Sequence, residues 1–449
     1  MRRRRTWFIT DINMETTDMF NTISRRKAIQ LLGGAALAAG LPRFASSTAW
    51  AADEDIEFTI AHTYGKIFRP IHTKIIKEFN KIHPNVHIRL EAPMSDYEEL
   101  TQRTLSGISQ GNAPVLSFQG VNQFRQYIEL GAAYDITPFT KDDPRWAAGS
   151  DYYPEMMRLC NFNGVQYGVP FAISTPIMYA NHTLLQKAGV DLSKPFKNWK
   201  DVIEAARKVR AYDSKCMGIY VDYQATGNWI WQAFLYCEGG TMMDEAEKRV
   251  TFADEPGLRA ARQLREFIDL GLMADATALQ GQQSFISGRV GFYIASTSWL
   301  KGVQDKIKGF EVKTHLFPEG STGLRRLPCG GNGAMIITKD PKVARAAYEY
   351  AMFASGPIGT AIQVAGSGYM PMNSKGTERL AAFYEENPNF KTSLEQIPTI
   401  FRWYAFPGTN TLKIIDVIKN DLQSIVSKRV SADDGIKAAA AEVQKLLAA

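Results

Sequence analysis

The chain has 449 residues, of which 45% are hydrophobic and 22% are charged. A domain usually holds about 100–200 residues, so we expect two or three domains with a sizeable core. This composition excludes a mainly disordered chain, and a mean hydropathy of −0.22 excludes a polytopic membrane protein. Residues 1–52 carry +5 of the formal net charge of +6, because they hold eight basic and three acidic residues. The rest of the chain is nearly neutral, so nucleic acid is not an expected partner.

The first 51 residues are expected to be an export signal. Ser24-Arg25-Arg26-Lys27 precedes a short, mildly apolar stretch at 28–41, and Ala49-Trp50-Ala51 follows as a small-residue cleavage pattern. These three features are typical of a secretory signal, and the apolar stretch is too short to span a bilayer. The paired arginines resemble a twin-arginine signal. We therefore expect a cleaved, periplasmic protein.

An oxidising compartment makes disulfides relevant. The chain has four cysteines, namely Cys160, Cys216, Cys237 and Cys329, and none of them form a Cys-x-x-Cys pair. This spacing gives little support to a metal or thioredoxin-like site. The sequence leaves open one disulfide, between Cys216 and Cys237, and buried free thiols.

After the signal, strands and helices are expected to alternate. The predicted strands are 56–61, 86–90, 115–118, 218–221, 290–295 and 333–337. The predicted helices are 70–83, 97–110, 199–210, 257–270, 343–353, 377–386, 410–427 and 432–447. Strands and helices at these intervals predict βαβ units and parallel sheets. Residues 167–180 are extended and apolar, but Pro170 and Pro176 limit ladder hydrogen bonds, so we expect a crossing segment rather than a central strand.

Motifs of catalysis and cofactor binding are weak in this sequence. It contains no P-loop, no His-Glu-x-x-His and no Gly-x-Gly-x-x-Gly. One Gly-x-Ser-x-Gly match at 107–111 closes a predicted helix, whereas a hydrolase elbow needs a strand before the serine. The six histidines show no metal-ligand spacing, and the acidic pairs fit solvated helix faces. We therefore expect no catalytic residue, metal or cofactor.

Aromatic clusters beside polar residues are more informative. They are Asn228-Trp229-Ile230-Trp231, Ser298-Trp299 and residues 402–408, which begin Arg402-Trp403-Tyr404. Aromatic rings next to polar groups suit sugars, which present an apolar C–H face and a hydroxyl edge. Core packing is the alternative for any single tryptophan, but the nearby glycines and prolines place these clusters near loops. Gly330-Gly331-Asn332-Gly333 would bring backbone amides close to a ligand, with a plain turn as the alternative.

A series of segments in chain order resembles the extracellular solute-binding proteins of ABC importers. The segments are Gly168-Val169-Pro170-Phe171 with Ser174-Thr175-Pro176, followed by 184–191, and also 79–84, 111–114, 198–201, 295–298, 330–331 and 367–371. The maltose-type group, and within it the glycerol-3-phosphate-binding proteins, is the most similar. The resemblance implies an α/β fold of two lobes, each a mainly parallel sheet flanked by helices, joined by hinge strands near 172–175, 295–298 and 330–332. It implies a first lobe of 52–173 plus 297–330 and a second lobe of 174–296 plus 331–449.

The resemblance also implies ligand contacts. By this resemblance, six residues match positions that contact the ligand in the family. They are Tyr97, Ser174, Trp229, Ser296, Gly331 and Tyr369. Neighbouring candidates are His62, Gln119, Ser298, Asn332, Arg402 and Trp403. Trp229 would stack on the ligand, the tyrosines and serines would form hydrogen bonds, and Gly331 would offer a backbone amide.

Two departures from the family pattern bear on the ligand. Gln119-Gly120 stands where the relatives carry a glutamate, and Phe406 stands where they carry an arginine that pairs with phosphate. Unless Arg402 reaches the site, phosphate loses its charge-assisted partner. We therefore favour a carbohydrate or sugar derivative. Glycerol-3-phosphate, a glycerophosphodiester or another anionic polyol remains an alternative through Arg402, His62 or Lys66.

The sequence thus predicts a monomeric, non-catalytic component of an ABC importer that captures a small solute by hinge closure and delivers it to the membrane permease. A secreted glycan-active enzyme is an alternative that requires two carboxylates across the cleft. A structural or adhesive surface protein is a third alternative, and it would have no enclosed pocket between lobes.

Overall fold

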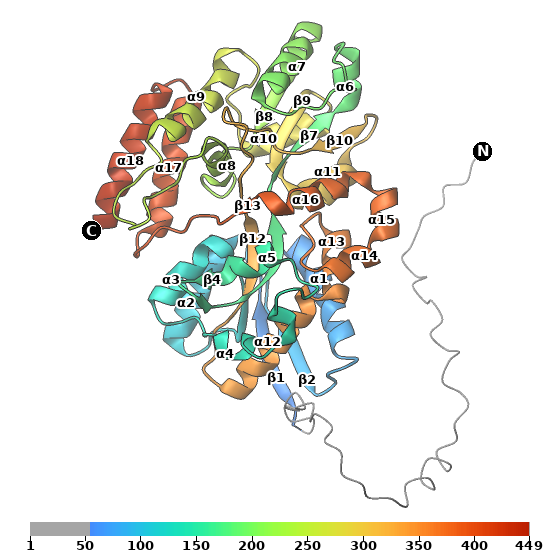
Figure 1. Ribbon diagram of the computed structural model, residues 1–449, viewed down its shortest axis with the longest axis vertical. Coiled ribbons are helices and arrows are strands. Elements are labelled where there is room, and N and C mark those ends of the chain that lie inside the picture. Colours follow the sequence, from blue (N-terminus) through green and yellow to red (C-terminus); the bar gives the residue numbers. More distant parts are fainter. Residues whose placement is uncertain (1–53, 449) are drawn as a thin grey trace, which may run out of the picture. The chain divides into compact units, whose positions relative to one another are not determined.

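The computed structural model describes residues 54–448 (Figure 1). The chain divides into Met1–Trp50 and a compact unit, Ala51–Ala449. The expected export signal and its cleavage pattern lie outside the described residues. Within residues 54–448, no helix combines the length and the apolar character needed to cross a membrane.

The first sheet has five strands in the order β2-β1-β3-β12-β6. They are β1 (Ile56–Ala61), β2 (Val86–Leu90), β3 (Leu116–Gly120), β6 (Val169–Ser174) and β12 (Gly330–Ile336). Its main helices are α1 (Gly65–Phe79), α2 (Tyr97–Gln110), α3 (Phe124–Glu129), α12 (Pro341–Ser355) and α13 (Pro357–Gly366). We term this sheet and its helices the first lobe.

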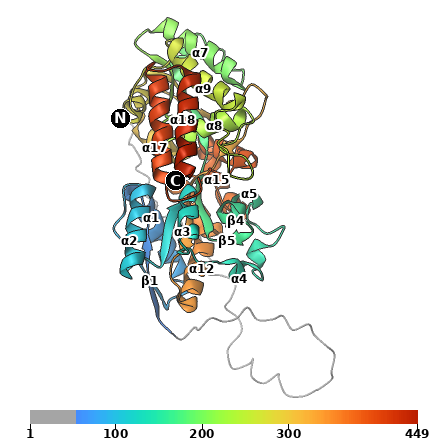
Figure 2. The same ribbon diagram turned by 90° about the vertical axis from the view of Figure 1, so that its left-hand side faces the viewer.

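The second sheet has four strands in the order β10-β7-β9-β8. They are β7 (Pro176–Asn181), β8 (Met217–Val221), β9 (Val290–Ser296) and β10 (Val312–His315). Its helices are α6 (His182–Lys187), α7 (Trp199–Tyr212), α8 (Trp229–Cys237), α9 (Glu255–Asp269), α10 (Ala278–Ile286), α17 (Thr411–Val426) and α18 (Ala432–Ala448). The last two lie side by side and pack on α9 (Figure 2). We term this sheet and its helices the second lobe.

Besides six 3₁₀ helices of three residues each, shorter elements complete the described chain. They are α4 (Thr137–Thr140), α5 (Pro154–Met157), α11 (Leu300–Lys306), α14 (Ser374–Arg379), α15 (Ala381–Glu386), α16 (Lys391–Glu395), β4 (Asn161–Phe162), β5 (Val165–Gln166), β11 (Leu327–Pro328) and β13 (Ile400–Phe401). β11 pairs in parallel with β13, so these two form a small ladder of their own.

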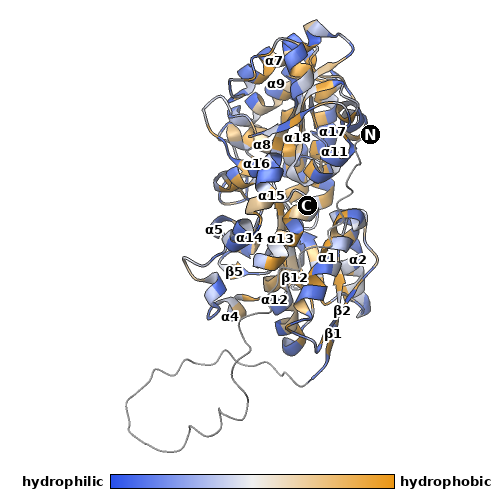
Figure 3. Ribbon diagram, turned by 90° about the vertical axis from the view of Figure 1, so that its right-hand side faces the viewer, coloured by the Kyte–Doolittle hydropathy of each residue, from blue (hydrophilic) through white to orange (hydrophobic). Residues whose placement is uncertain are grey.

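Local sequence explains where several elements begin and end. The Asp96 carboxylate accepts a hydrogen bond from the amide of Glu99, which caps α2, and Gly111 ends that helix at φ +73°. Asn198 and Asp201 form a capping box at the start of α7. Every residue of β6, β7, β9 and β12 is buried, and the hydropathy colours of Figure 3 show apolar residues concentrated inside the lobes. The core of each lobe is therefore its sheet.

Both sheets are mixed rather than mainly parallel. β1 pairs in parallel with β2 and β3, but β12 runs antiparallel to β3 and β6. In the second sheet, β8 and β9 are parallel, whereas β7 runs antiparallel to β9 and β10. A helical crossover returns the chain to the same end of a sheet and gives parallel neighbours. β7 and β12 instead enter their sheets directly from the other lobe, at the opposite end of the sheet, so they are antiparallel to the strands beside them.

Two segments lie in the sheet opposite to the expected one. β10, expected in the first lobe, pairs with β7 of the second. β12 was expected to belong mostly to the second lobe, but it lies between β3 and β6 of the first, and α12 packs on it. Hydrogen bonding to a particular strand decides lobe membership, and no local pattern encodes that choice. α12 and α13 were also expected in the second lobe, but α12 packs on β6 and β1, and α13 packs on α1, so both belong to the first. The other lobe boundaries stay a prediction.

Proline positions explain two further differences. The expected crossing segment at 167–180 is two buried strands, β6 and β7, and β7 lies between β10 and β9. Pro170 is tolerated because β6 is at a sheet edge, and Pro176 because it is the first residue of β7. The helix expected at 70–83 instead spans α1, with Pro70 inside it, because Phe68 is also part of its buried face.

Candidate functional site

Five polar side chains from both lobes form a continuous group, which we term the hydroxyl cluster. Its members are Tyr97, Ser296, Ser298, Asn332 and Tyr369. The Asn332 amide donates to the Tyr97 hydroxyl at 3.0 Å. The Tyr369 hydroxyl contacts the hydroxyls of Tyr97 and Ser298, and Ser298 Oγ lies 2.8 Å from Ser296 Oγ. The cluster therefore runs from α2 and β12 of the first lobe to the end of β9 in the second.

Neighbouring elements fix the cluster in place. Tyr97 is the first residue of α2, and a Cβ at Gly120 would come within 2.9 Å of its ring, so a glycine is needed where β3 ends. The Tyr64 ring meets the Tyr97 ring edge-on at 5.4 Å. On the second lobe, the Tyr179 hydroxyl donates to the Ser296 carbonyl at 2.6 Å. Packing and hydrogen bonds therefore hold the group from both lobes.

The hydroxyl cluster is electrically neutral. Burial raises the pKa of Tyr97 well above its ordinary value and the pKa of Tyr369 to about 12, so both hydroxyls keep their protons near neutral pH. The Asn332 side-chain oxygen is buried and has no hydrogen-bond partner. The cluster can donate and accept hydrogen bonds but offers no charge, which suits an uncharged polar ligand.

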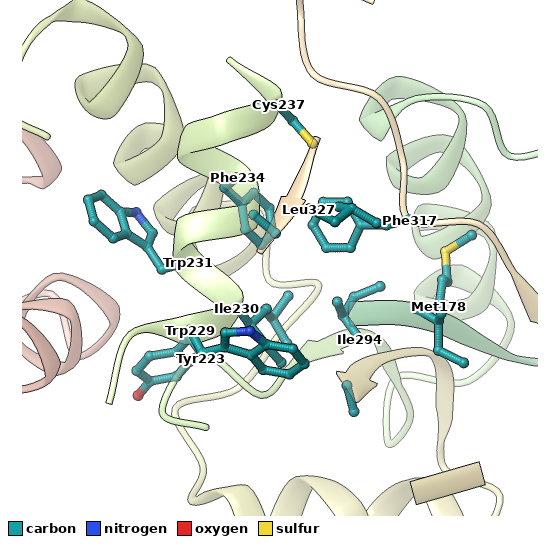
Figure 4. Packing of buried hydrophobic residues seen from close by; sticks show 14 of the residues in the cluster. Met178, Tyr223, Trp229, Ile230, Trp231, Phe234, Cys237, Ile294, Phe317 and Leu327 are labelled. Carbon is teal, nitrogen blue, oxygen red and sulfur yellow. The ribbon is translucent and has the colours of Figure 1, made fainter. Parts of the chain in front are cut away.

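Two tryptophans form a second part of the site, the indole pair of Trp229 and Trp403. Their ring centroids lie 6.1 Å apart at an interplanar angle of 51°. A Cβ at Gly330 would come within 2.6 Å of the Trp229 ring and 2.9 Å of Ser174 Oγ, so these groups share one contact region. Figure 4 shows Trp229 leaving the start of α8 in a different direction from Trp231 and Phe234. Trp229 thus extends from the second lobe to a strand of the first.

Gly331 has a structural requirement of its own. Its φ is +95°, and a Cβ there would come within 1.8 Å of the Ala172 carbonyl oxygen. Only glycine allows β12 to approach β6 this closely. The neighbouring Gly330, rather than Gly331, faces the indole of Trp229.

Gln119 and His62 have their side-chain partners inside the first lobe instead. The Gln119 amide donates to the Tyr127 hydroxyl at 2.6 Å, and its oxygen accepts from Thr101 at 3.3 Å. His62 packs against His72 with 5.5 Å between ring centroids, and burial lowers its pKa. Neither residue belongs to the hydroxyl cluster.

The residues expected to supply positive charge lie elsewhere. Arg402 is exposed, with its guanidinium 5.9 Å from the centre of the Phe162 ring, and Lys66 is exposed on α1. Phe406 is buried against Tyr404, with 5.1 Å between their ring centroids. Arg402 is therefore not among the buried hydroxyls.

An ion pair that the sequence did not predict joins the two lobes. The guanidinium of Arg125 on α3 donates through both terminal nitrogens to the Glu247 carboxylate, each at 2.7 Å. Glu247 lies between α8 and α9, and it also accepts from the Tyr404 hydroxyl at 2.9 Å. These bonds lower the pKa of Glu247. The bidentate geometry is the strongest form of such a pair, but each residue alone resembles ordinary surface charge, so no sequence signal identified it.

Gln396 is a second residue that sequence reasoning missed. Its amide nitrogen donates to Thr175 Oγ1 at 2.6 Å and to the Pro176 carbonyl at 2.9 Å, which holds the passage from β6 to β7. All four cysteines are within the described residues, and each is a buried free thiol, so Cys216 and Cys237 are not joined.

Two α/β lobes, direct strand connections between them and a polar cluster drawn from both define a two-lobed binding protein of the periplasmic type. Residues 74–392 match the family of bacterial extracellular solute-binding proteins. Since this match covers more than half of the chain, the chain belongs to that family.

Similar proteins support this assignment. The sn-glycerol-3-phosphate-binding periplasmic protein UgpB of Escherichia coli K12 is 22% identical over 355 residues, 72% of this chain and 76% of the relative. The structure of UgpB from Mycobacterium tuberculosis with glycerophosphocholine has a TM-score of 0.75 at 20% identity and covers 88% of this chain and 98% of that one. The cyclic α-maltosyl-1,6-maltose-binding protein of Arthrobacter globiformis has a TM-score of 0.74 at 20% identity, with coverages of 88% and 99%. At these identities the structural likeness establishes the fold.

Proposed function

We propose that this protein captures a carbohydrate or sugar derivative between its lobes and delivers it to the permease of an ABC importer. Family membership supports solute binding. The observation that carries the ligand class is the neutral hydroxyl cluster beside the indole pair. A sugar has a hydroxyl edge for the first and an apolar C–H face for the second.

Hinge closure would couple capture to delivery. A ligand that contacts both lobes favours the closed state by its differential affinity, so closure reports occupancy to the permease. The passage from β6 to β7, held by Gln396, is one connection about which the lobes would turn. A monomer is sufficient for this mechanism.

An anionic polyol is the second candidate, because the relatives include binding proteins for glycerol-3-phosphate and glycerophosphocholine. Phosphate is usually held by arginine or several charged donors. The hydroxyl cluster contains no cationic residue, and Arg402 is exposed beside Phe162. These features favour an uncharged ligand.

A thermal-shift panel tests the ligand class. The probes are neutral mono- and oligosaccharides including maltose, with glycerol-3-phosphate and glycerophosphocholine as anionic and zwitterionic probes. A neutral saccharide should raise the melting temperature by several degrees, since a ligand stabilises only the state that binds it. Stabilisation by glycerol-3-phosphate alone would instead establish the second candidate.

We propose that the protein has no catalytic activity. The members of the hydroxyl cluster include no carboxylate, and the similar proteins are binding proteins. Incubation with chromogenic glycosides should release no chromophore above a buffer control. An adhesive role predicts no ligand-dependent closure, so a compact ligand-bound form in small-angle scattering would argue against it.

The N-terminal segment suggests export through the twin-arginine route followed by cleavage after Ala51. Replacing Arg25 and Arg26 by lysine should keep the precursor in the cytoplasm, whereas the unchanged chain should appear in the periplasmic fraction with Ala52 as its first residue. Periplasmic delivery of the lysine variant at an unchanged level would exclude that route.

A further inference from the structure

The segment Asp222–Trp229, which comprises the loop after β8 and the first residue of α8, holds a concentration of unpaired buried polar atoms. They are Asp222 Oδ1, Thr226 Oγ1, Asn228 Nδ2 and Trp229 Nε1. Buried polar side-chain atoms nearly always have hydrogen-bond partners, so four unpaired ones within one short loop call for an explanation. We term this segment the β8–α8 loop.

Other residues of the β8–α8 loop are held by α17. The Tyr223 hydroxyl and the Gln224 amide both donate to the side-chain oxygen of Gln423, at 2.7 and 2.6 Å. A Cβ at Gly227 would come within 2.2 Å of the Ile415 side chain, so the backbone packs directly on the same helix. The loop is therefore anchored on α17, while the unpaired atoms belong to residues outside these contacts.

The loop backbone is also strained. Thr226 has φ +46°, a left-handed conformation that β-branched residues rarely adopt, and Gly227 follows at φ +85°. Such conformations persist where the surrounding structure enforces them, and they gather at ligand-binding sites. Strain and unpaired polar atoms are independent observations that coincide in the β8–α8 loop.

The position of the loop relates it to both parts of the candidate site. β8 and β9 are parallel, so the loop after β8 begins at the same sheet edge as Ser296 of the hydroxyl cluster. The Asp222 amide donates to the Ile294 carbonyl on β9 at 3.0 Å. At its other end, Trp229 belongs to the indole pair. The carboxyl edge of parallel strands is where open α/β sheets bind ligands.

We propose that the β8–α8 loop is the second lobe's polar contact with the solute, and that Asp222 is its specificity-determining residue. The Asp222 carboxylate accepts a hydrogen bond from a solute hydroxyl, and the Asn228 amide and Trp229 indole N–H donate to solute oxygens. The inference rests on the proposed function and narrows it to an uncharged, polyhydroxylated solute. A buried carboxylate repels the phosphate group of a monoester, which near neutral pH is mostly a dianion and has no hydrogen-bond donors of its own.

The surroundings of Asp222 leave it without a countercharge. The titratable groups that interact with it are the tyrosines Tyr220, Tyr223 and Tyr293, and burial raises the pKa of each, so all three are neutral near pH 7. Burial likewise raises the pKa of Asp222 to about 7. Within residues 54–448 no ion pair involves Asp222, so a hydroxyl donor from the solute would be its partner.

Calorimetric titration of the purified protein tests the inference. The probes are maltose, other neutral saccharides and glycerol-3-phosphate. Asp222→Ala should weaken binding of the best saccharide at least tenfold, and Asp222→Asn should weaken it less. The matched control is Asp142→Ala, which removes an exposed aspartate of the first lobe, and its affinity should stay within twofold of the wild type. Circular dichroism melts establish that each variant is folded, and Asp222→Asn keeps the test valid if the alanine variant is not.

The pH dependence gives a second readout. Saccharide affinity of the wild type should fall as the pH drops below 7, because the accepting carboxylate becomes protonated, whereas Asp222→Asn should show no such fall. Unchanged affinity in folded Asp222→Ala, or tighter binding of glycerol-3-phosphate than of any saccharide, overturns the inference and leaves solute binding intact. Failure of every probe to bind would overturn the proposed sugar ligand itself.

Discussion

The hydroxyl cluster and the β8–α8 loop differ in how their polar atoms are paired. In the cluster, Tyr97, Asn332 and Ser296 each have a side-chain partner, and among its five members Asn332 Oδ1 alone is an unpaired buried atom. In the loop, Asp222 and Asn228 keep unpaired buried atoms. A side chain that already has a hydrogen-bond partner is oriented before the ligand binds. A buried side chain without a partner gains a new hydrogen bond from the ligand. The cluster would therefore position the solute, and the loop would contribute binding free energy because its unpaired atoms gain hydrogen bonds when the solute binds.

The largest expected effect is on the free energy of unfolding and comes from Asp222 of the β8–α8 loop. The Asp222 pKa of about 7 lies above the ordinary value of about 4 for an unfolded chain. Between these values the unfolded state releases its proton while the folded state keeps it, so this carboxyl makes folding less favourable as the pH rises from 4 to 7. Asp222→Asn removes that term and should gain up to about 4 kcal/mol relative to the wild type across this range.

Urea titrations at pH 4 and pH 8 measure the change. Asp142→Asn, which alters an exposed aspartate, serves as the control and should show no comparable change. An Asp222→Asn variant whose stability relative to the wild type is the same at both pH values would contradict the raised pKa.

The indole pair gives the next largest effect. Trp229→Ala removes a buried aromatic surface at the contact between the lobes and should weaken saccharide binding by about 2 kcal/mol, roughly thirtyfold. Calorimetry measures the loss. The control is Trp146→Phe, because Trp146 bonds to Tyr348 within the first lobe. Equal losses for the two variants would mean that the effect is not local to the indole pair.

The interlobe ion pair tests whether closure, rather than ligand contact, is changed. Glu247→Gln weakens its bidentate pair with Arg125 and should shift the ligand-free protein toward open forms by about 1–2 kcal/mol, since the pair is only partly buried. Small-angle scattering should report a larger radius of gyration. Arg249→Gln, in an exposed pair with Asp254 on the same lobe, is the matched control. No change in radius would show that the pair does not hold the lobes together.

The smallest effect is expected for the hydroxyl cluster, again on the free energy of unfolding. Tyr97→Phe removes the acceptor of the Asn332 amide and should lower the free energy of unfolding by about 1 kcal/mol even without ligand. Thermal melts measure it, with Tyr64→Phe as control because Tyr64 packs on Tyr97 but is not the acceptor of the Asn332 amide. A Tyr97→Phe variant as stable as the wild type would remove the distinction between the paired and unpaired regions.

Much of the candidate site was accessible from the sequence because its residues lie in recognisable local contexts. Tyr97 follows a helix cap, Ser296 directly follows the strand expected at 290–295 and Trp229 begins a helix two residues after a glycine. Asp222 was overlooked, although it directly follows the strand expected at 218–221. Strand ends are where open α/β sheets bind ligands, so its position alone was a usable signal.

The sequence by itself determined the local elements of this protein. The expected strands at 56–61 and 86–90 and the helix at 97–110 are confirmed residue for residue, because alternation and capping are properties of neighbouring residues. The tertiary structure alone decided the strand directions, the sheet to which β10 and β12 belong, and the pairing of Gln119 with Tyr127 and of Arg125 with Glu247. Those choices join residues distant in the chain, and they depend on packing and hydrogen bonding that exist only once the lobes have formed.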